Sequence, residues 1–359
     1  MFTLSSGKDG IQSDYGTETE ETPEGKGFIY IAGGKFQITA GDDGLQASSF
    51  VRIADGTLQI AAEDDGIHAD GEAAVHSGEL IISKSYEGIE GQTVEITGGN
   101  IQILSADDGL NASSGNGQNH TAGGQREEPF ASAEDCVIQI SGGNIVINAS
   151  GDGIDSNGNL YVSGGETYVY GPENDGNGAL DYAGEAEITG GVFAASGAGG
   201  MAQNFGESSS QGAMLATLQE WAEGTAALTD SSGAEVFSCT PEKKYNSILI
   251  STPDIQEGET YTLTAGEQQV TVEMTGLIYG AGGMGGGMGG GMGGGMGRPG
   301  QGGMPEDMGG QPGEGMETPG GMGERPAGEM EPPGDMGGPH EGGMEPPDFI
   351  WQSTNSSMA

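Results

Sequence analysis

Two turn residues followed by an alternating strand recur through the first two hundred residues, and this repeat constrains the fold more than any other feature. The copies include GGKFQI at 33, GGNIQI at 98 and GGNIVI at 142. The second glycine recurs in steps of 22, 22, 21, 44 and 22 residues, at Gly34, Gly56, Gly78, Gly99, Gly143 and Gly165. A fixed period of this length is typical of a solenoid, in which each repeat packs on its neighbours.

Each repeat contains two further strands. An acidic turn with a short strand recurs as DDGLQA at 42, DDGIHA at 64 and DDGLNA at 107, and another strand, such as FVRIA at 50, precedes a Gly-Gly-like turn. Three short strands and three turns in 22 residues match one turn of a parallel β-helix. The sequence therefore predicts an all-β fold, with a right-handed three-faced parallel β-helix over residues 1–205.

Alternating apolar residues provide the core of this predicted coil. Side chains alternate between the two faces of a strand, so every second residue points inward and stacks on its equivalent in the next turn. The inward residues of the Gly-Gly strands are Phe36, Ile38, Leu58, Ile60, Leu80, Ile82, Ile101, Ile103, Ile145 and Ile147. Glycine is expected at the turns, because it accepts positive φ without a steric penalty.

Four segments depart from the repeat. Two polar, Gly-rich insertions, Tyr15 to Gly27 and Ser113 to Asp135, follow the acidic-turn strand and are expected to leave the coil as loops at one corner. Residues 211–276 show ordinary strand alternation and predict a small C-terminal β module, sandwich-like, that caps the coil. Residues 280–359 consist of Gly, Met and Pro with acidic residues, a composition typical of a disordered tail.

The chain is strongly acidic. It has 54 acidic and 10 basic side chains, for a formal net charge of -44, and this charge excludes nucleic acid as a partner. No stretch of 18 apolar residues is present, so the sequence predicts no transmembrane segment. Cys136 and Cys239 stand apart from any CxxC or Cys/His pair, which leaves no zinc or redox motif of the usual spacing.

The acidic turns predict a metal site. Adjacent turns of a parallel coil lie roughly 4.8 Å apart, so equivalent turn residues stack into a column. Two carboxylates at that distance repel by about 3 kcal/mol at an effective dielectric near 20. Calcium removes this repulsion, because it takes six to eight oxygen ligands from carboxylates, carbonyls and water. Carbonyls beside Gly44, Gly66, Gly109 and Gly153 are expected to add ligands. The alternative is that the aspartates only shape the turns and solubilise the coil.

The residues of this predicted site can be named. The candidate calcium ligands are Asp9, Asp42, Asp43, Asp64, Asp65, Asp70, Glu87, Glu90, Asp107, Asp108, Asp152, Asp155, Asp175 and Asp181. Tyr86, Tyr170 and Tyr182 lie near the turns and offer a surface for carbohydrate, with packing on the strands as the alternative. His68 and His76 lack a second His or Cys at a metal-ligand spacing, and exposed strand positions are expected for both.

Several unlike motifs in a fixed order carry a family resemblance. KSYEGIEG at 84, SGDGIDSNG at 150 and NGALDYAGEAEITGG at 177 resemble the calcium-binding, carbohydrate-binding parallel β-helix proteins of bacterial cell surfaces, over about residues 1–270. The resemblance implies a pectate-lyase-like architecture, several calcium ions and an extracellular or cell-surface location. It also implies binding of plant cell-wall polysaccharide, either pectate (polygalacturonate) or cellulose. A monomer is expected.

The start of the chain departs from the pattern of this family. MFTLSSGKDG lacks the basic and apolar regions of a signal peptide, and Met1 stands where other repeats have a Gly-Gly turn. We therefore expect further strands, and a signal peptide, upstream of the sequence given.

Two other functions compete with polysaccharide binding. In a pectate-lyase-type enzyme, calcium acidifies the proton beside a uronate carboxylate and a basic side chain removes it. Lys84 is the best candidate for that base, although a lysine among carboxylates stays charged, which favours its substitution for a missing cation in the column. The third hypothesis is a surface scaffold or adhesin stiffened by calcium. The methionines of the tail favour a flexible tether over a copper(I) site.

Overall fold

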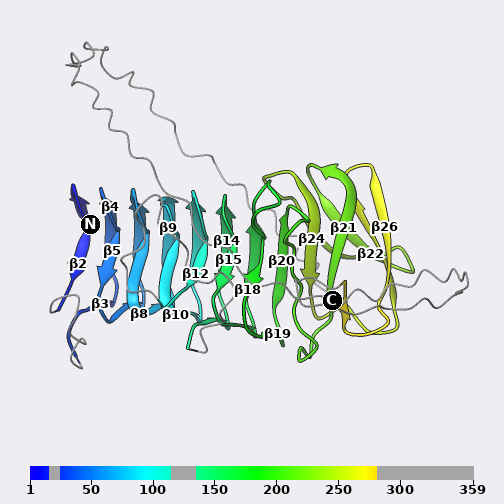
Figure 1. The fold of residues 1–359 in the computed structure, drawn as a ribbon, viewed down its shortest axis with the longest axis horizontal. Coiled ribbons are helices and arrows are strands. Elements are labelled where there is room, and N and C mark those ends of the chain that lie inside the picture. The colour runs from blue at the N-terminus through cyan, green and yellow to red at the C-terminus, as the bar shows by residue number, and fades with distance from the viewer. Residues whose placement is uncertain (16–24, 115–134, 281–359) are drawn as a thin grey trace, which may run out of the picture. The chain divides into compact units, whose positions relative to one another are not determined.

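The computed structural model describes residues 1–15, 25–114 and 135–280, and within these ranges the protein is all β (Figure 1). The predicted parallel β-helix is present, because successive strands of each face pair in parallel from one turn of the coil to the next. The described residues include no helix long and apolar enough to cross a membrane. The central parts of both predicted loops, and the predicted tail beyond residue 280, lie outside the described residues.

The first face of the coil contains the strands that follow the Gly-Gly turns. They lie side by side in the order of the sequence (Figure 1). These strands are β1 (Phe2–Ser5), β4 (Lys35–Thr39), β7 (Thr57–Ala61), β9 (Glu79–Lys84), β11 (Asn100–Ser105), β14 (Asn144–Ala149), β17 (Glu166–Tyr170) and β20 (Val192–Gly197).

The second and third faces share two long strands that bend from one face to the other. The first part of β8 (Ile67–Val75) pairs with the second face and its last part with the third, and β10 (Ile89–Ile96) does the same. The other strands of the second face are β2 (Ile11–Ser13), β5 (Leu45–Ala47), β12 (Leu110–Ala112), β15 (Ile154–Ser156) and β18 (Asp181–Tyr182). Those of the third face are β3 (Phe28–Ile31), β6 (Phe50–Ile53), β13 (Val137–Ile140), β16 (Asn159–Val162) and β19 (Ala186–Ile188).

Aliphatic ladders fill the interior, as the alternation predicted. On the first face Ile38, Ile60, Ile82, Ile103 and Ile147 are in register from turn to turn, and all five side chains are buried. Similar ladders line the other two faces. Each turn therefore covers the apolar surface of the next, which is how a coil with so much glycine obtains a core.

Glycine serves two different purposes at the corners. Gly78, Gly99 and Gly143, at the Gly-Gly turns, have φ values of 95°, 100° and 95°. At the acidic turns, by contrast, a Cβ on Gly66 would lie 2.6 Å from the carbonyl oxygen of Gly88, and one on Gly88 would lie 2.2 Å from that of Gly109. The expectation that positive φ explains the glycines is therefore wrong at the acidic turns, where close packing of neighbouring turns requires them.

The last turn of the coil continues into antiparallel strands. β20 pairs with β24 (Tyr245–Ser251), and β24 pairs with β21 (Ala213–Ala222), which also contacts β27 (Ile278–Tyr279). A second sheet consists of β22 (Ala226–Asp230), β23 (Glu235–Cys239), β25 (Thr260–Ala265) and β26 (Gln268–Glu273). A separate apolar cluster that includes Tyr245 and Leu263 contains residues from both sheets.

Candidate functional site

The corner before the second face carries two columns of polar residues. In the first column, one acid stands two residues before each of the first six strands of that face: Asp9, Asp43, Asp65, Glu87, Asp108 and Asp152. In the second column, one polar residue stands three positions later in each turn: Gln12, Gln46, His68, Glu90, Asn111, Asp155 and Asp181. The register of the strands stacks the second column directly, pairing Gln46 with His68 and His68 with Glu90.

The carboxylates of the first column hold adjacent turns together. The amide of Asp65 donates a hydrogen bond of 3.0 Å to Oδ1 of Asp43, and the amide of Glu87 donates one of 3.3 Å to Oδ1 of Asp65. The amide of Asp152 donates to Oδ1 of Asp108 at 2.7 Å. These aspartates therefore do shape the turns. In each pair, Oδ1 of the aspartate accepts the amide of the adjacent turn. The second carboxylate oxygen, Oδ2, takes no part in this ladder.

The turn carbonyls take part in a second ladder. The carbonyl oxygen of Gly66 accepts the amide of Leu45 at 3.2 Å, and that of Gly153 accepts the amide of Leu110 at 3.2 Å. The carbonyls of Gly44 and Gly109 are engaged in the same way. Each of these carbonyls therefore already accepts one backbone hydrogen bond, and its second lone pair is not used by this ladder.

The first cluster of carboxylates lies near the start of the coil. Asp42, Asp43 and Asp64 each offer an oxygen, and the three oxygens lie within 4.8 Å of one another. Burial raises the pKa of Asp43 to about 6. Nζ of the solvent-exposed Lys8 lies 3.7 Å from Oδ2 of Asp42.

The second cluster joins both columns. Oxygens of Asp108, Asp152 and Asp155 lie within 4.8 Å of one another. Burial, with repulsion from Asp155 and Asp152, raises the pKa of Asp108 to about 9. Three carboxylates at this spacing are hard oxygen donors, and a divalent cation of the calcium type fits such a set, with water completing the shell.

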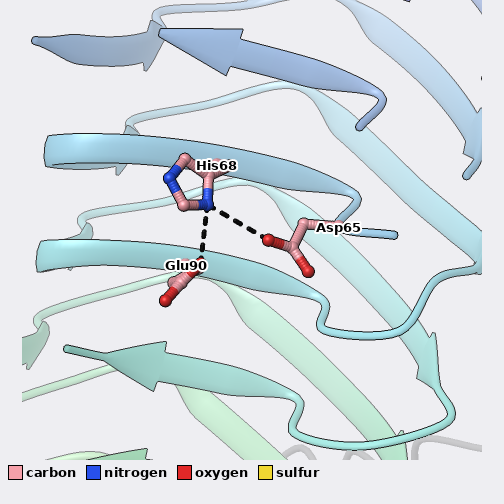
Figure 2. A group of neighbouring side chains, drawn as sticks. All are labelled: Asp65, His68 and Glu90. Carbon is pink, nitrogen blue, oxygen red and sulfur yellow. Dashed lines mark hydrogen bonds and ion pairs between the residues drawn. The ribbon is translucent and has the colours of Figure 1, made fainter. Parts of the chain in front are cut away.

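The third cluster contains a histidine that the sequence did not assign to the site. Nδ1 of His68 lies 3.1 Å from Oδ2 of Asp65 and 2.6 Å from Oε2 of Glu90 (Figure 2). Only 13% of the His68 side chain is exposed, so the expected exposed strand position is wrong for this residue. His76 is half-buried and contacts Oγ1 of Thr97 through Nδ1.

The remaining predicted ligands lie around these clusters or away from them. Oδ1 of Asp9 accepts the amide of Asp43 at 3.3 Å, and a carboxylate oxygen of Glu87 accepts Nδ2 of Asn111 at 2.8 Å. Asp70 contacts Nε2 of His68, and Asp107 bonds to the hydroxyl of Tyr86.

The end of the column differs from the predicted arrangement. Asp175 was expected in the first column, but the amide of Gly178 occupies that level and donates to Oδ1 of Asp152 at 2.5 Å. Asp175 instead accepts the amide of Gly200 at 3.1 Å. Asp181 continues the second column and accepts a hydrogen bond from Gln203.

The predicted sugar-binding tyrosines do not share one surface. Tyr86 is exposed at the acidic corner, and its hydrogen bond to Asp107 and burial raise its pKa to about 12. Tyr170 is half-buried at the end of β17, on the first face, and burial raises its pKa. The hydroxyl of Tyr182, on the second face, donates to the carbonyl of Asn204 at 2.6 Å. Only Tyr86 is adjacent to the carboxylate clusters.

Two further features bear on the predicted functions. Nζ of Lys84 lies 2.5 Å from Oε1 of Glu63, and both side chains are exposed. A groove of about 1030 Å³ runs along the Gly-Gly corner, between Asp55 and Pro253, and its walls include Glu79, Asn144 and Glu166. Among the residues that the structure describes, no lysine, arginine or histidine lines this groove.

Comparison with known proteins gives one result for this chain. No curated protein and no solved structure matches it. Residues 1–136, which include the first cluster and the third, match the model of a family described as carbohydrate-binding domain-containing protein.

Proposed function

We propose that this protein binds acidic polysaccharide through calcium ions held at two clusters, Asp42–Asp43–Asp64 and Asp108–Asp152–Asp155. The observation that carries the proposal is the second cluster, in which three carboxylate oxygens from adjacent turns lie within 4.8 Å of one another. Ionising all three without a cation is costly, as the raised pKa of Asp108 indicates. A bound calcium ion offsets that cost and ties two turns of the coil together.

The donor set favours calcium over smaller or softer ions. Both clusters offer carboxylate oxygens only, and calcium accepts six to eight oxygens in a flexible geometry that includes water. Magnesium requires near-octahedral geometry and gives up its water reluctantly, and transition metals prefer sites with nitrogen or sulfur. Water ligands on a partly exposed calcium ion can be replaced by oxygens of a ligand.

Polysaccharide is the partner that the family match supports, since the matched family is described as carbohydrate-binding. A bare column of carboxylates repels a uronate polymer, but calcium reverses the sign of the interaction by bridging protein and uronate carboxylates. A regular polymer also suits a corner that presents similar groups at successive turns. Tyr86, exposed beside the clusters, offers a ring for contact with sugar.

The proposal is tested by affinity electrophoresis of the full chain through gels containing polygalacturonate, with calcium or with EGTA. We expect retardation that requires calcium. Asp155→Asn removes one charged ligand and is expected to shift the calcium dependence to about tenfold higher concentration. Glu207→Gln, which removes one exposed charge outside the columns, is the matched control and is expected to behave as the parent protein.

Two results would contradict this function. One is equal retardation in calcium and EGTA. The other is loss of binding in Asn144→Ala, a variant of the Gly-Gly groove, with full binding in Asp155→Asn, because the polymer would then lie in the groove.

A further inference from the structure

The third cluster differs chemically from the two carboxylate clusters. One ring nitrogen, Nδ1 of His68, faces oxygens of both Asp65 and Glu90, at 3.1 and 2.6 Å. A ring nitrogen carries at most one proton, so it donates a full hydrogen bond to only one of two acceptors. Oε2 of Glu90 is buried and, within the described part of the chain, has no hydrogen bond of regular geometry; Glu90 as a whole is only 4% exposed. Figure 2 shows the three side chains converging from neighbouring turns.

Each of the three side chains is held in place through its other polar atom. Nε2 of His68 lies 3.3 Å from Oδ1 of Asp70, and Oε1 of Glu90 accepts the hydroxyl of Ser113 at 2.7 Å. Oδ1 of Asp65 accepts the amide of Glu87. Nδ1 of His68, Oδ2 of Asp65 and Oε2 of Glu90 therefore remain, and Nδ1 lies 3.1 and 2.6 Å from the two oxygens. A histidine whose second nitrogen contacts a carboxylate is the usual arrangement behind a metal-ligating imidazole.

We propose that Asp65, His68 and Glu90 bind one divalent transition-metal ion of the zinc type, separately from the calcium clusters. One imidazole and two carboxylates are a ligand set that zinc accepts at tetrahedral geometry, with water as the fourth ligand. Calcium is selected against, because its ligands are oxygens and this set includes a nitrogen.

The position of this ion gives it a structural role. His68 lies on β8 and Glu90 on β10, and the two residues pair directly in adjacent turns. An ion between them cross-links the two strands that bend between the second and third faces. It also supplies positive charge to the most deeply buried part of the first column, where Asp65 is only 2% exposed. Metal binding at such a site contributes directly to folding stability.

The test is calorimetric titration of the metal-stripped full chain with zinc chloride, in millimolar calcium that occupies the carboxylate clusters. We expect one zinc site that is lost in His68→Ala, weakened at least 100-fold in Glu90→Gln, and weakened about 10- to 100-fold in Asp70→Asn, which removes a supporting carboxylate. His76→Ala is the matched control, because the His76 ring contacts Oγ1 of Thr97 and belongs to none of the three clusters, and this variant is expected to keep the site.

Cobalt(II) provides a second readout that does not depend on heat of binding. Cobalt at a site with one nitrogen and three oxygens is expected to give visible absorption bands that are absent in His68→Ala and retained in His76→Ala. Asp70→Asn keeps the test decisive if His68→Ala fails to fold, because Asp70 is exposed. Identical zinc titrations of the parent, Asp70→Asn and folded Glu90→Gln proteins would overturn the proposal. Displacement of this zinc by stoichiometric calcium would overturn it as well.

Discussion

The amide of Asp152 donates a 2.7 Å hydrogen bond to Oδ1 of Asp108, although 44 residues separate the two in sequence. The Asp108 side chain therefore has two roles. Its Oδ1 accepts a hydrogen bond that joins adjacent turns, and its charge contributes to the proposed calcium site. Because asparagine keeps the oxygen and loses the charge, two substitutions separate these roles.

We expect Asp108→Asn and Asp108→Ala to differ most clearly in chelator. Asp108→Asn removes a carboxyl group whose ionisation is opposed by burial and by Asp155 and Asp152, so its free energy of unfolding in EGTA should equal or exceed that of the parent. Asp108→Ala also removes the acceptor of the Asp152 amide and should lower that free energy by about 1–3 kcal/mol. Urea unfolding followed by circular dichroism measures both values. Calcium should stabilise both variants less than it stabilises the parent protein.

The pH dependence of stability should reverse when calcium is added. Asp43 and Asp108 have folded-state pKa values of about 6 and about 9, both above the ordinary value of 3.8. Between the ordinary pKa and the folded one, the folded state binds more protons than the unfolded state, so stability falls as pH rises. In EGTA we therefore expect the melting temperature to decrease from pH 5 to pH 9. With millimolar calcium, which binds the ionised carboxylates, it should rise or stay level over the same range.

A melting temperature in EGTA that rises from pH 5 to pH 9 would contradict this assignment of the carboxylates. The same experiment on Asp108→Asn provides the control. Without the Asp108 carboxyl, which has the higher of the two pKa values, the decrease in melting temperature between pH 7 and pH 9 should become smaller.

Lys84 is the residue that a lyase function would require, and its surroundings do not suit that role. Its ammonium pairs with Glu63 at 2.5 Å at the end of β9, and Lys84 belongs to none of the three clusters. We expect polygalacturonate incubated with the protein and calcium to yield no unsaturated product, measured by its ultraviolet absorbance. Lys84→Ala should retain calcium-dependent binding. Product formation that disappears in Lys84→Ala would establish the enzymatic alternative.

The sequence predicted the coil well, because the repeat directly encodes which residues meet. A period of 22 places Ile38, Ile60 and Ile82 in one ladder, and no interaction outside the repeat is needed to fix their positions. The same period also predicted that the acids of the first column stack from turn to turn. Asp175 was misplaced because the period changes at its turn, where the bonded partners Asp152 and Gly178 are 26 residues apart.

His68 was missed because its role depends on contacts that a motif does not contain. Its partner Glu90 belongs to the next turn, and the pairing of the two becomes evident only in the register of β8 with β10. A signal was nevertheless present. Every residue three positions after a first-column acid is polar, and this shared phase groups His68 with Gln46, Glu90 and Asn111. A second column read from the sequence in this way would have placed the histidine beside the acids.

The glycines of the acidic turns provide a prediction about the fold itself. A Cβ on Gly109 would lie 2.4 Å from the carbonyl oxygen of Gly153 and 2.2 Å from Cγ2 of Ile147, and Gly109 does not have a positive φ. Gly109→Ala should therefore lower the free energy of unfolding through steric overlap between turns, by about 1–3 kcal/mol or more. Gly7→Ala is the matched control, because a Cβ there meets nothing within 4 Å.

Chemical denaturation of both variants in saturating calcium measures the effect and separates it from any loss of metal. If backbone conformation alone governed the acidic turns, Gly109→Ala would be neutral or slightly stabilising, since alanine restricts the unfolded chain more than glycine does. A large loss at Gly109 with none at Gly7 would instead show that contact between neighbouring turns requires the glycine. Because the same close contact sets the spacing of the carboxylates, Gly109→Ala should also weaken calcium binding at the cluster of Asp108, Asp152 and Asp155.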